Sequence, residues 1–150
     1  MRLVIVNVGG KRPPAICETH EIRAVIARSV EHAMSEVATA VKDALVSPHI
    51  DGYLAVNLRP VEGASEKDLF FVETGSNGPG FSESHFYHLI WAKSTLEARN
   101  IAKNHDRKWH VDTVFNLSRM ARQSGYDIDG DAQQDPKDFS TEMSLYAPIN

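Results

Sequence analysis

The spacing of hydrophobic residues is typical of strands in some segments and of a helix in others, and the order of these segments repeats along the chain. The apolar run Leu3–Val8 predicts a short strand that is covered on both faces. A stretch rich in glycine and proline follows, and the β-branched residues of Ile22–Ala27 then predict a second strand. Apolar residues at helical spacing after the capping residue Ser29 predict a helix, and the alternation of Ile50–Leu58 predicts a third strand.

The same order of elements returns in the second half of the chain. Leu69–Val72 predicts a strand 66 residues after the first one, and another glycine-rich stretch follows it. Tyr87–Ala92 predicts the next strand, Ser94 the start of a helix, and Val111–Leu117 a final strand. These matches indicate a tandem duplication of a ββαβ unit.

We therefore predict an α+β protein in which two ββαβ repeats, 1–59 and 69–118, form one packed pseudo-twofold domain. Its expected core is a mixed sheet with both helices on one face. Residues 60–68 are expected to be a polar linker, and 119–150 an irregular acidic C-terminal tail. A single packed domain is expected because units of this size rarely bury enough apolar surface to fold alone.

Histidine and acidic residues recur at equivalent positions of the two halves. A Glu-x-His motif precedes each second strand and a His-x-Asp motif begins each third strand. The resulting candidate residues are Glu18, His20, His49 and Asp51 in the first half and Glu83, His85, His110 and Asp112 in the second. Within each motif the two side chains share a face, because residues i and i+2 of an extended segment point the same way.

Two interpretations of these residues differ in what holds them together. Imidazole and carboxylate groups are ligands that suit zinc, iron or manganese. The interpretation that we favour from the sequence is a hydrogen-bond network, in which aspartate orients histidine and the histidine holds the glycine-rich loop. The loops themselves are candidate binding segments, marked by Gly9, Gly10, Gly75 and Gly78.

The combination of motifs resembles a known family. An apolar strand that ends in Gly9-Gly10, followed by Glu18-Thr19-His20 and His49-Ile50-Asp51, is similar to a small bacterial family, domain of unknown function 1543. Members of that family carry one or two copies of the domain. The resemblance covers about residues 2–118 and implies the fold and the duplication, but no activity. The second copy departs from the pattern at Ser76, where the first has a glycine.

Composition and charge narrow the classes of partner. The formal net charge of −4 argues against a nucleic acid as partner. The single cysteine, Cys17, excludes an internal disulfide framework and is typical of a reducing compartment. The opening apolar run is too short for a secretory signal or a membrane span, so we expect a cytoplasmic protein without a membrane partner.

Three functions stay open on the sequence alone. No complete catalytic constellation is visible, so the leading hypothesis is a non-catalytic binding or interaction module that uses the Gly/Pro loops and the adjacent His, Asp and Glu residues. The first alternative is a metal-dependent enzyme that uses His20, His49, Asp51 and their repeat equivalents. The second is a structural homodimer without a small ligand. No cofactor is predicted apart from the divalent metal of the first alternative.

Overall fold

The computed structural model describes residues 1–63, 65–77, 83–105, 109–130 and 147–149. The chain divides into two compact units, Met1–Leu58 with Lys137–Asn150, and Arg59–Pro136. The predicted α+β class is confirmed, but the sheet prediction is wrong, because there are two antiparallel sheets instead of one mixed sheet. In each unit both outer strands pair antiparallel with the first strand, which lies between them.

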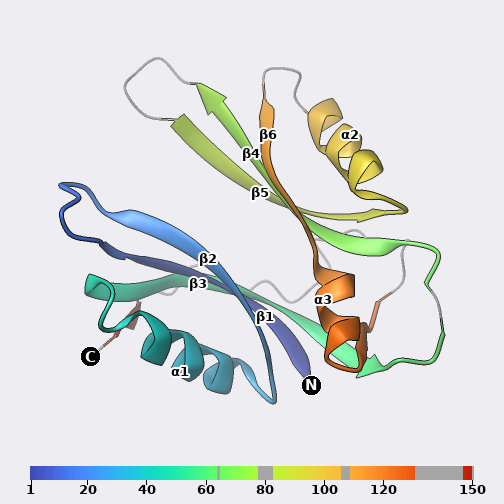
Figure 1. Cartoon of the computed structure of the whole chain (residues 1–150), viewed down its shortest axis with the longest axis horizontal. Coiled ribbons are helices and arrows are strands. Elements are labelled where there is room, and N and C mark those ends of the chain that lie inside the picture. Colours follow the sequence, from blue (N-terminus) through green and yellow to red (C-terminus); the bar gives the residue numbers. More distant parts are fainter. Residues whose placement is uncertain (64, 78–82, 106–108, 131–146, 150) are drawn as a thin grey trace. The chain divides into compact units, whose positions relative to one another are not determined.

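The first unit contains three long strands and one helix. These are β1 (Arg2–Lys11), β2 (Thr19–Ala27), α1 (Val30–Val41) and β3 (Val46–Pro60), with the strand order β2-β1-β3. A short strand, β8 (Ala147–Pro148), pairs with β3 at His49 and Ile50. Figure 1 shows α1 lying along one face of this sheet.

The second unit has the same order of strands and helix at its start. It consists of β4 (Asp68–Asn77), β5 (Glu83–Ala92), α2 (Thr95–His105) and β6 (His110–Asn116), followed by α3 (Leu117–Gln123) and β7 (Tyr126–Ile128). The strand order is β5-β4-β6, so the first strand is again central. α2 lies against this sheet and α1 against the first, so the two main helices do not share one face of a common sheet (Figure 1).

Alternate residues of each central strand face the helix of the same unit and form its core. In the first unit Val4, Val6 and Val8 pack with residues of α1 such as Ala33 and Val37. In the second, Phe70 and Val72 pack with Ala98 and Ala102 of α2. Apolar residues on the other face of the central strands, such as Leu3, Ile5, Leu69 and Phe71, are buried as well, as the continuous apolar runs predicted.

Helix starts follow the capping residues that the sequence indicated. The Ser29 hydroxyl accepts a hydrogen bond from the His32 amide at 3.2 Å, and the Ser94 hydroxyl accepts one from the Glu97 amide at 3.2 Å. The Glu97 carboxylate in turn accepts from the Lys93 amide at 2.7 Å. These contacts satisfy amide groups that have no partner within the helix.

The segment after the second repeat has more regular structure than the irregular acidic tail that we expected. The helix α3 ends at Gln123, and Gly125 just beyond it has the positive φ of 82° typical of the residue after a helix. Asp127 on β7 is only 5% exposed and its carboxylate lies 3.7 Å from the Arg122 guanidinium. This ion pair explains why an acidic residue is buried there. Residues 131–146 of the expected tail lie outside the described residues. None of the described helices is long and apolar enough to cross a membrane.

Candidate metal sites

A glycine in each central strand is flanked by two histidines from the neighbouring strands. Gly9 of β1 pairs with His20 of β2 and with His49 of β3. In the second unit Gly75 of β4 pairs with His85 of β5 and His110 of β6. Residues directly opposite each other in a sheet project to the same face. Each glycine therefore leaves a gap between two imidazole rings.

Side-chain atoms of the histidines and carboxylates occupy the space beside each glycine. A side chain at either glycine would therefore displace them. A Cβ atom at Gly9 would collide with His49 Nε2 and lie 2.9 Å from Asp51 Oδ2. A Cβ atom at Gly75 would collide with Glu83 and lie 2.7 Å from His110 Nε2. Glycine is thus required for close approach at both positions.

These positions correct two of our expectations about the loops. Gly9, Gly10 and Gly75 belong to strands, because the ladder hydrogen bonds continue past them to Lys11 and Asn77. Glycine is uncommon in strands, so the sequence pattern indicated a loop. The fourth glycine, Gly78, lies outside the described residues.

A β-bulge in each unit brings an aspartate beside the histidines. Asn7 pairs with Gly52 and Val8 with Ile50, so that Asp51 is left as the extra residue of β3. The register of the second unit skips Asp112 on β6 in the same way. A bulge redirects a side chain and often lies next to a functional site. Asp51 Oδ2 lies 3.2 Å from His20 Nε2, and Asp51 Oδ1 lies 3.3 Å from His49 Nε2.

The first site, formed by Glu18, His20, His49 and Asp51, is anchored by a backbone contact of His49. His49 Nδ1 lies 3.1 Å from the carbonyl oxygen of Ser47, a residue with a left-handed φ of 51°. A carbonyl can only accept, so Nδ1 carries the hydrogen and Nε2 faces the site. Glu18 Oε1 lies 3.5 Å from this Nε2. The donor atoms of Glu18, His20 and His49 lie within 4.8 Å of one another.

Asp51 adds a polar atom without a hydrogen bond to the first site. Its Oδ2 is buried and has no hydrogen-bond partner, although His20 Nε2 is close to it. A buried carboxylate oxygen in this condition carries a desolvation cost of about 1–3 kcal/mol. A cation bound between the imidazole rings would remove that cost.

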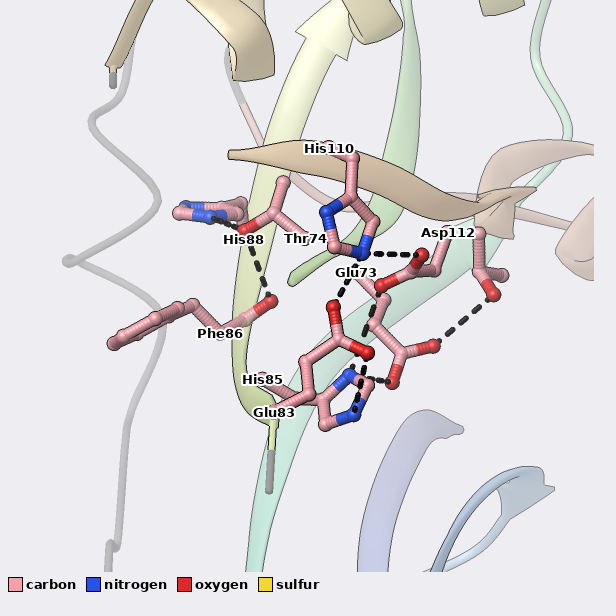
Figure 2. A network of polar contacts seen from close by, with 9 residues as sticks. Glu73, Thr74, Glu83, His85, Phe86, His88, His110 and Asp112 are labelled. Carbon is pink, nitrogen blue, oxygen red and sulfur yellow. Dashed lines mark hydrogen bonds and ion pairs between the residues drawn. The ribbon is translucent and has the colours of Figure 1, made fainter. Parts of the chain in front are cut away.

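The second site, formed by Glu83, His85, His110 and Asp112, has a different internal arrangement (Figure 2). His110 Nε2 contacts Glu83 and lies 3.2 Å from Asp112 Oδ1. His85 instead directs Nδ1 to Glu73 Oε1 at 3.2 Å. The donor atoms that converge within 4.8 Å are those of Glu83, His110 and Asp112, without His85.

Glu73 is a site residue that the sequence reasoning missed. It lies two residues before Gly75 on the same strand face, and its Oε2 accepts a hydrogen bond from Thr113 Oγ1 at 3.1 Å. The corresponding residue of the first unit is Asn7, so Glu73 did not belong to the repeated pattern. Burial and, to a smaller extent, the Glu73 carboxylate raise the pKa of Tyr87, which pairs with it across the strands.

The eight candidate residues thus come together in two groups of four, one in each unit. Histidine–carboxylate contacts join the members of each group. Cys17 is exposed and belongs to neither group.

Comparison with solved structures supports the fold of the whole chain. The chain is similar to the crystal structure of a protein Il1583 from Idiomarina loihiensis, with a TM-score of 0.61 and 21% sequence identity. The similarity covers 99% of this chain and 98% of the other. No family model and no curated protein match the chain. The likeness to Il1583 therefore describes the architecture, and the resemblance to domain of unknown function 1543 stays a prediction.

Proposed function

We propose that the protein is a binding module that holds one divalent metal ion in each unit, between the histidines that flank Gly9 and Gly75. The observation that carries this proposal is the orientation of His49. Its Nδ1 donates to the Ser47 carbonyl, so in the neutral ring Nε2 presents a lone pair to the carboxylates of Glu18 and Asp51. Acceptors that face one another repel unless a proton or a metal cation lies between them.

The chemistry of the donors fits a transition metal. Glu18 and Asp51 bring two negative charges to a site with two imidazole rings, so a divalent ion would neutralise the group. Zinc binds histidine nitrogen and carboxylate oxygen at about 2.0–2.2 Å. The hydrogen bond from His49 Nδ1 to a backbone carbonyl is the outer contact that metal-binding histidines commonly make.

A proton on His49 Nε2 is the competing way to place a positive charge at the first site, and it corresponds to the hydrogen-bond network favoured from the sequence. Elemental analysis of untagged protein separates the two. Metal binding predicts near-stoichiometric zinc, iron or manganese in each unit, and a chelator should lower the melting temperature. A protein that is metal-free after purification and that takes up no zinc in calorimetric titration would contradict the proposal.

His32 provides a matched control for the titration. His32 Nε2 lies 3.3 Å from Glu36 Oε1 on the exposed surface of α1, so it is a histidine–carboxylate pair outside both sites. His49→Ala should remove one bound zinc ion per chain. His32→Ala should leave the zinc stoichiometry unchanged.

A second candidate is a metal-dependent enzyme that uses the same residues. Catalytic metal sites combine three protein ligands with an open coordination position. Three donors converge in each site, and the side chains of Glu18 and His20 are both 47% exposed, so a substrate could reach a metal there. Hydrolysis of a phosphate ester or carboxylic ester by zinc-loaded protein, lost in His49→Ala, would favour this candidate.

We also propose that the two units arose by tandem duplication of one ββαβ unit. The shared strand order, the pairing of each central glycine with two histidines and the bulged aspartate of each unit support this origin. The pseudo-twofold arrangement of the units in one packed domain stays a prediction. A crystal structure in which a rotation far from two-fold relates the units would contradict it.

A further inference from the structure

We propose that the two sites differ in metal preference, with a higher selectivity for zinc over manganese at the first site than at the second. This inference rests on the proposed function, because it assumes that both sites bind metal. The converging donors of the first site are two imidazole nitrogens and one carboxylate oxygen, from His20, His49 and Glu18. Those of the second are one imidazole nitrogen and two carboxylate oxygens, from His110, Glu83 and Asp112.

The donor types determine the direction of the difference. Imidazole suits zinc, copper, iron and nickel, whereas carboxylate oxygen suits magnesium, calcium and manganese. Most sites bind zinc more tightly than manganese in absolute terms, so the relevant quantity is the ratio of the two dissociation constants at each site. Replacing an imidazole by a carboxylate should shift that ratio toward manganese.

One residue accounts for the loss of the second imidazole. Glu73 Oε1 lies 3.2 Å from His85 Nδ1, while Thr113 holds the other Glu73 oxygen. His85 Nδ1 thus lies closer to Glu73 than to Asp112 Oδ2, which is 3.6 Å away. Asn7 has the corresponding place in the first unit, two residues before Gly9, and its buried Oδ1 has no hydrogen-bond partner. His20 is consequently left to face Asp51.

Burial of one histidine acts in the same direction. The His49 side chain is 5% exposed, whereas that of His110 is 47% exposed. The other converging donors are partly exposed at both sites, Glu18 and His20 at 47% each and Glu83 and Asp112 at 31% and 30%. The first site thus has an imidazole held in place within the fold, which favours an ion that prefers nitrogen ligands, such as zinc.

The test isolates each site in the full-length chain. The double variant His110→Ala, Asp112→Asn retains the first site, and His49→Ala, Asp51→Asn retains the second. Zinc dissociation constants are measured by competition with a chromophoric chelator, and manganese constants by electron paramagnetic resonance of the free ion. The preference for zinc over manganese should be at least about tenfold greater in the chain that retains the first site.

Single substitutions at the position that differs test the cause. Glu73→Asn, introduced into the chain that retains the second site, should release His85 and raise the preference for zinc about tenfold. Asn7→Glu in the chain that retains the first site should lower the preference for zinc. Opposite effects of the two substitutions would show that neither result comes from misfolding of one variant. Glu62→Gln is the matched control, because Glu62 is 73% exposed and pairs with Arg59, which belongs to neither site.

The outcomes separate this inference from the proposed function. Equal preferences in the two chains, or no response to Glu73→Asn and Asn7→Glu in folded protein, would overturn the inference and leave metal binding intact. If neither chain binds zinc or manganese, the proposed function fails and the inference fails with it. Circular dichroism establishes that each variant is folded.

Discussion

The two sites share a geometry but differ in what surrounds them. In both, a central glycine lies between two histidines and a bulged aspartate, yet His49 is nearly buried and His110 is half exposed. Strand β8 lies beside β3 and pairs with His49, and the Ile149 amide donates to the Pro48 carbonyl at 2.9 Å. In the described part of the second unit, β6 is an edge strand.

The comparison shows that strand register creates the site and that neighbouring elements set its properties. The pairing of a glycine with two histidines involves only the three long strands that each unit contains. Some differences between the sites involve residues outside the repeated motifs, such as Glu73 beside His85 and the β8 segment paired with β3. Substitutions can therefore be divided into those that should affect both sites equally and those that should affect one.

Substitution of the central glycines should have the largest effect on metal binding and stability, and the effect should be equal in the two units. Gly9→Ala places a methyl group against His49 and Asp51, and Gly75→Ala places one against Glu83 and His110. Each should weaken metal binding at its own site by more than about 100-fold and cost about 1–3 kcal/mol of unfolding free energy. Zinc titration and urea unfolding measure the two effects. Gly63→Ala is the control, because a Cβ there meets nothing within 4 Å.

A glycine variant that binds zinc with unchanged affinity would show that the gap beside the imidazoles is not the metal position. A strong effect at Gly9 alone would limit the shared geometry to the first unit.

The histidines of β3 and β6 should differ in their contribution to stability without metal. His49→Ala should lower the free energy of unfolding by about 1–3 kcal/mol, because it removes a side chain that is only 5% exposed together with its hydrogen bond to the Ser47 carbonyl. His110→Ala should change it by no more than about 0.5 kcal/mol, as is usual for exposed positions. Urea unfolding in the presence of a chelator measures both values. Equal losses would mean that burial does not distinguish the sites.

Local features of the fold were predictable from the sequence. Ser29 and Ser94 begin helices because a hydroxyl before an amphipathic run satisfies free amide groups. The histidines and carboxylates of each half come together because i and i+2 side chains share a strand face. The sheet number was not predictable, because which strands pair depends on contacts distant in sequence.

Other features could not be predicted for identifiable physical reasons. Gly9 in a strand resembles a loop residue until the cross-strand partners that require its small size are known. Glu73 contributes to the second site only because Thr113 and His85 lie across from it. Pairing of β8 with β3 at His49 joins residues about 100 positions apart in the sequence, and no periodicity predicts such a contact.

The β8 segment offers a smaller and more selective test of the difference in shelter. Ile149 is partly buried against the core of the first unit. Ile149→Ala should lower the free energy of unfolding by about 1 kcal/mol, below the range for a fully buried site. It should also weaken zinc binding at the first site and leave the second unchanged. Calorimetric titration of the two one-site chains measures this. An equal effect on both sites would contradict the role given to β8.

The smallest expected effect concerns a pair of positions on the face opposite the sites. Glu21 pairs with Val8, directly before Gly9, and Phe86 pairs with Thr74, directly before Gly75. In the first unit Glu21 binds the guanidinium groups of Arg12 and Arg23. In the second, Phe86 stacks on Trp109 with ring centroids 4.8 Å apart. The same strand position is thus ionic in one unit and aromatic in the other.

These partners make only the Glu21 position sensitive to pH. Hydrogen bonds from Arg23 and then Arg12 lower the pKa of Glu21 below its ordinary value of 4.5. The stabilisation is therefore complete above the unfolded pKa and is lost as the pH falls through the folded pKa. Glu21→Gln should cost about 0.5 kcal/mol at pH 7 because the pair is near the surface. This difference from the wild type should shrink as urea unfolding is repeated toward pH 4, whereas the effect of Phe86→Leu should stay constant. A Glu21→Gln difference that is the same at every pH would mean that the carboxylate charge does not stabilise the first unit.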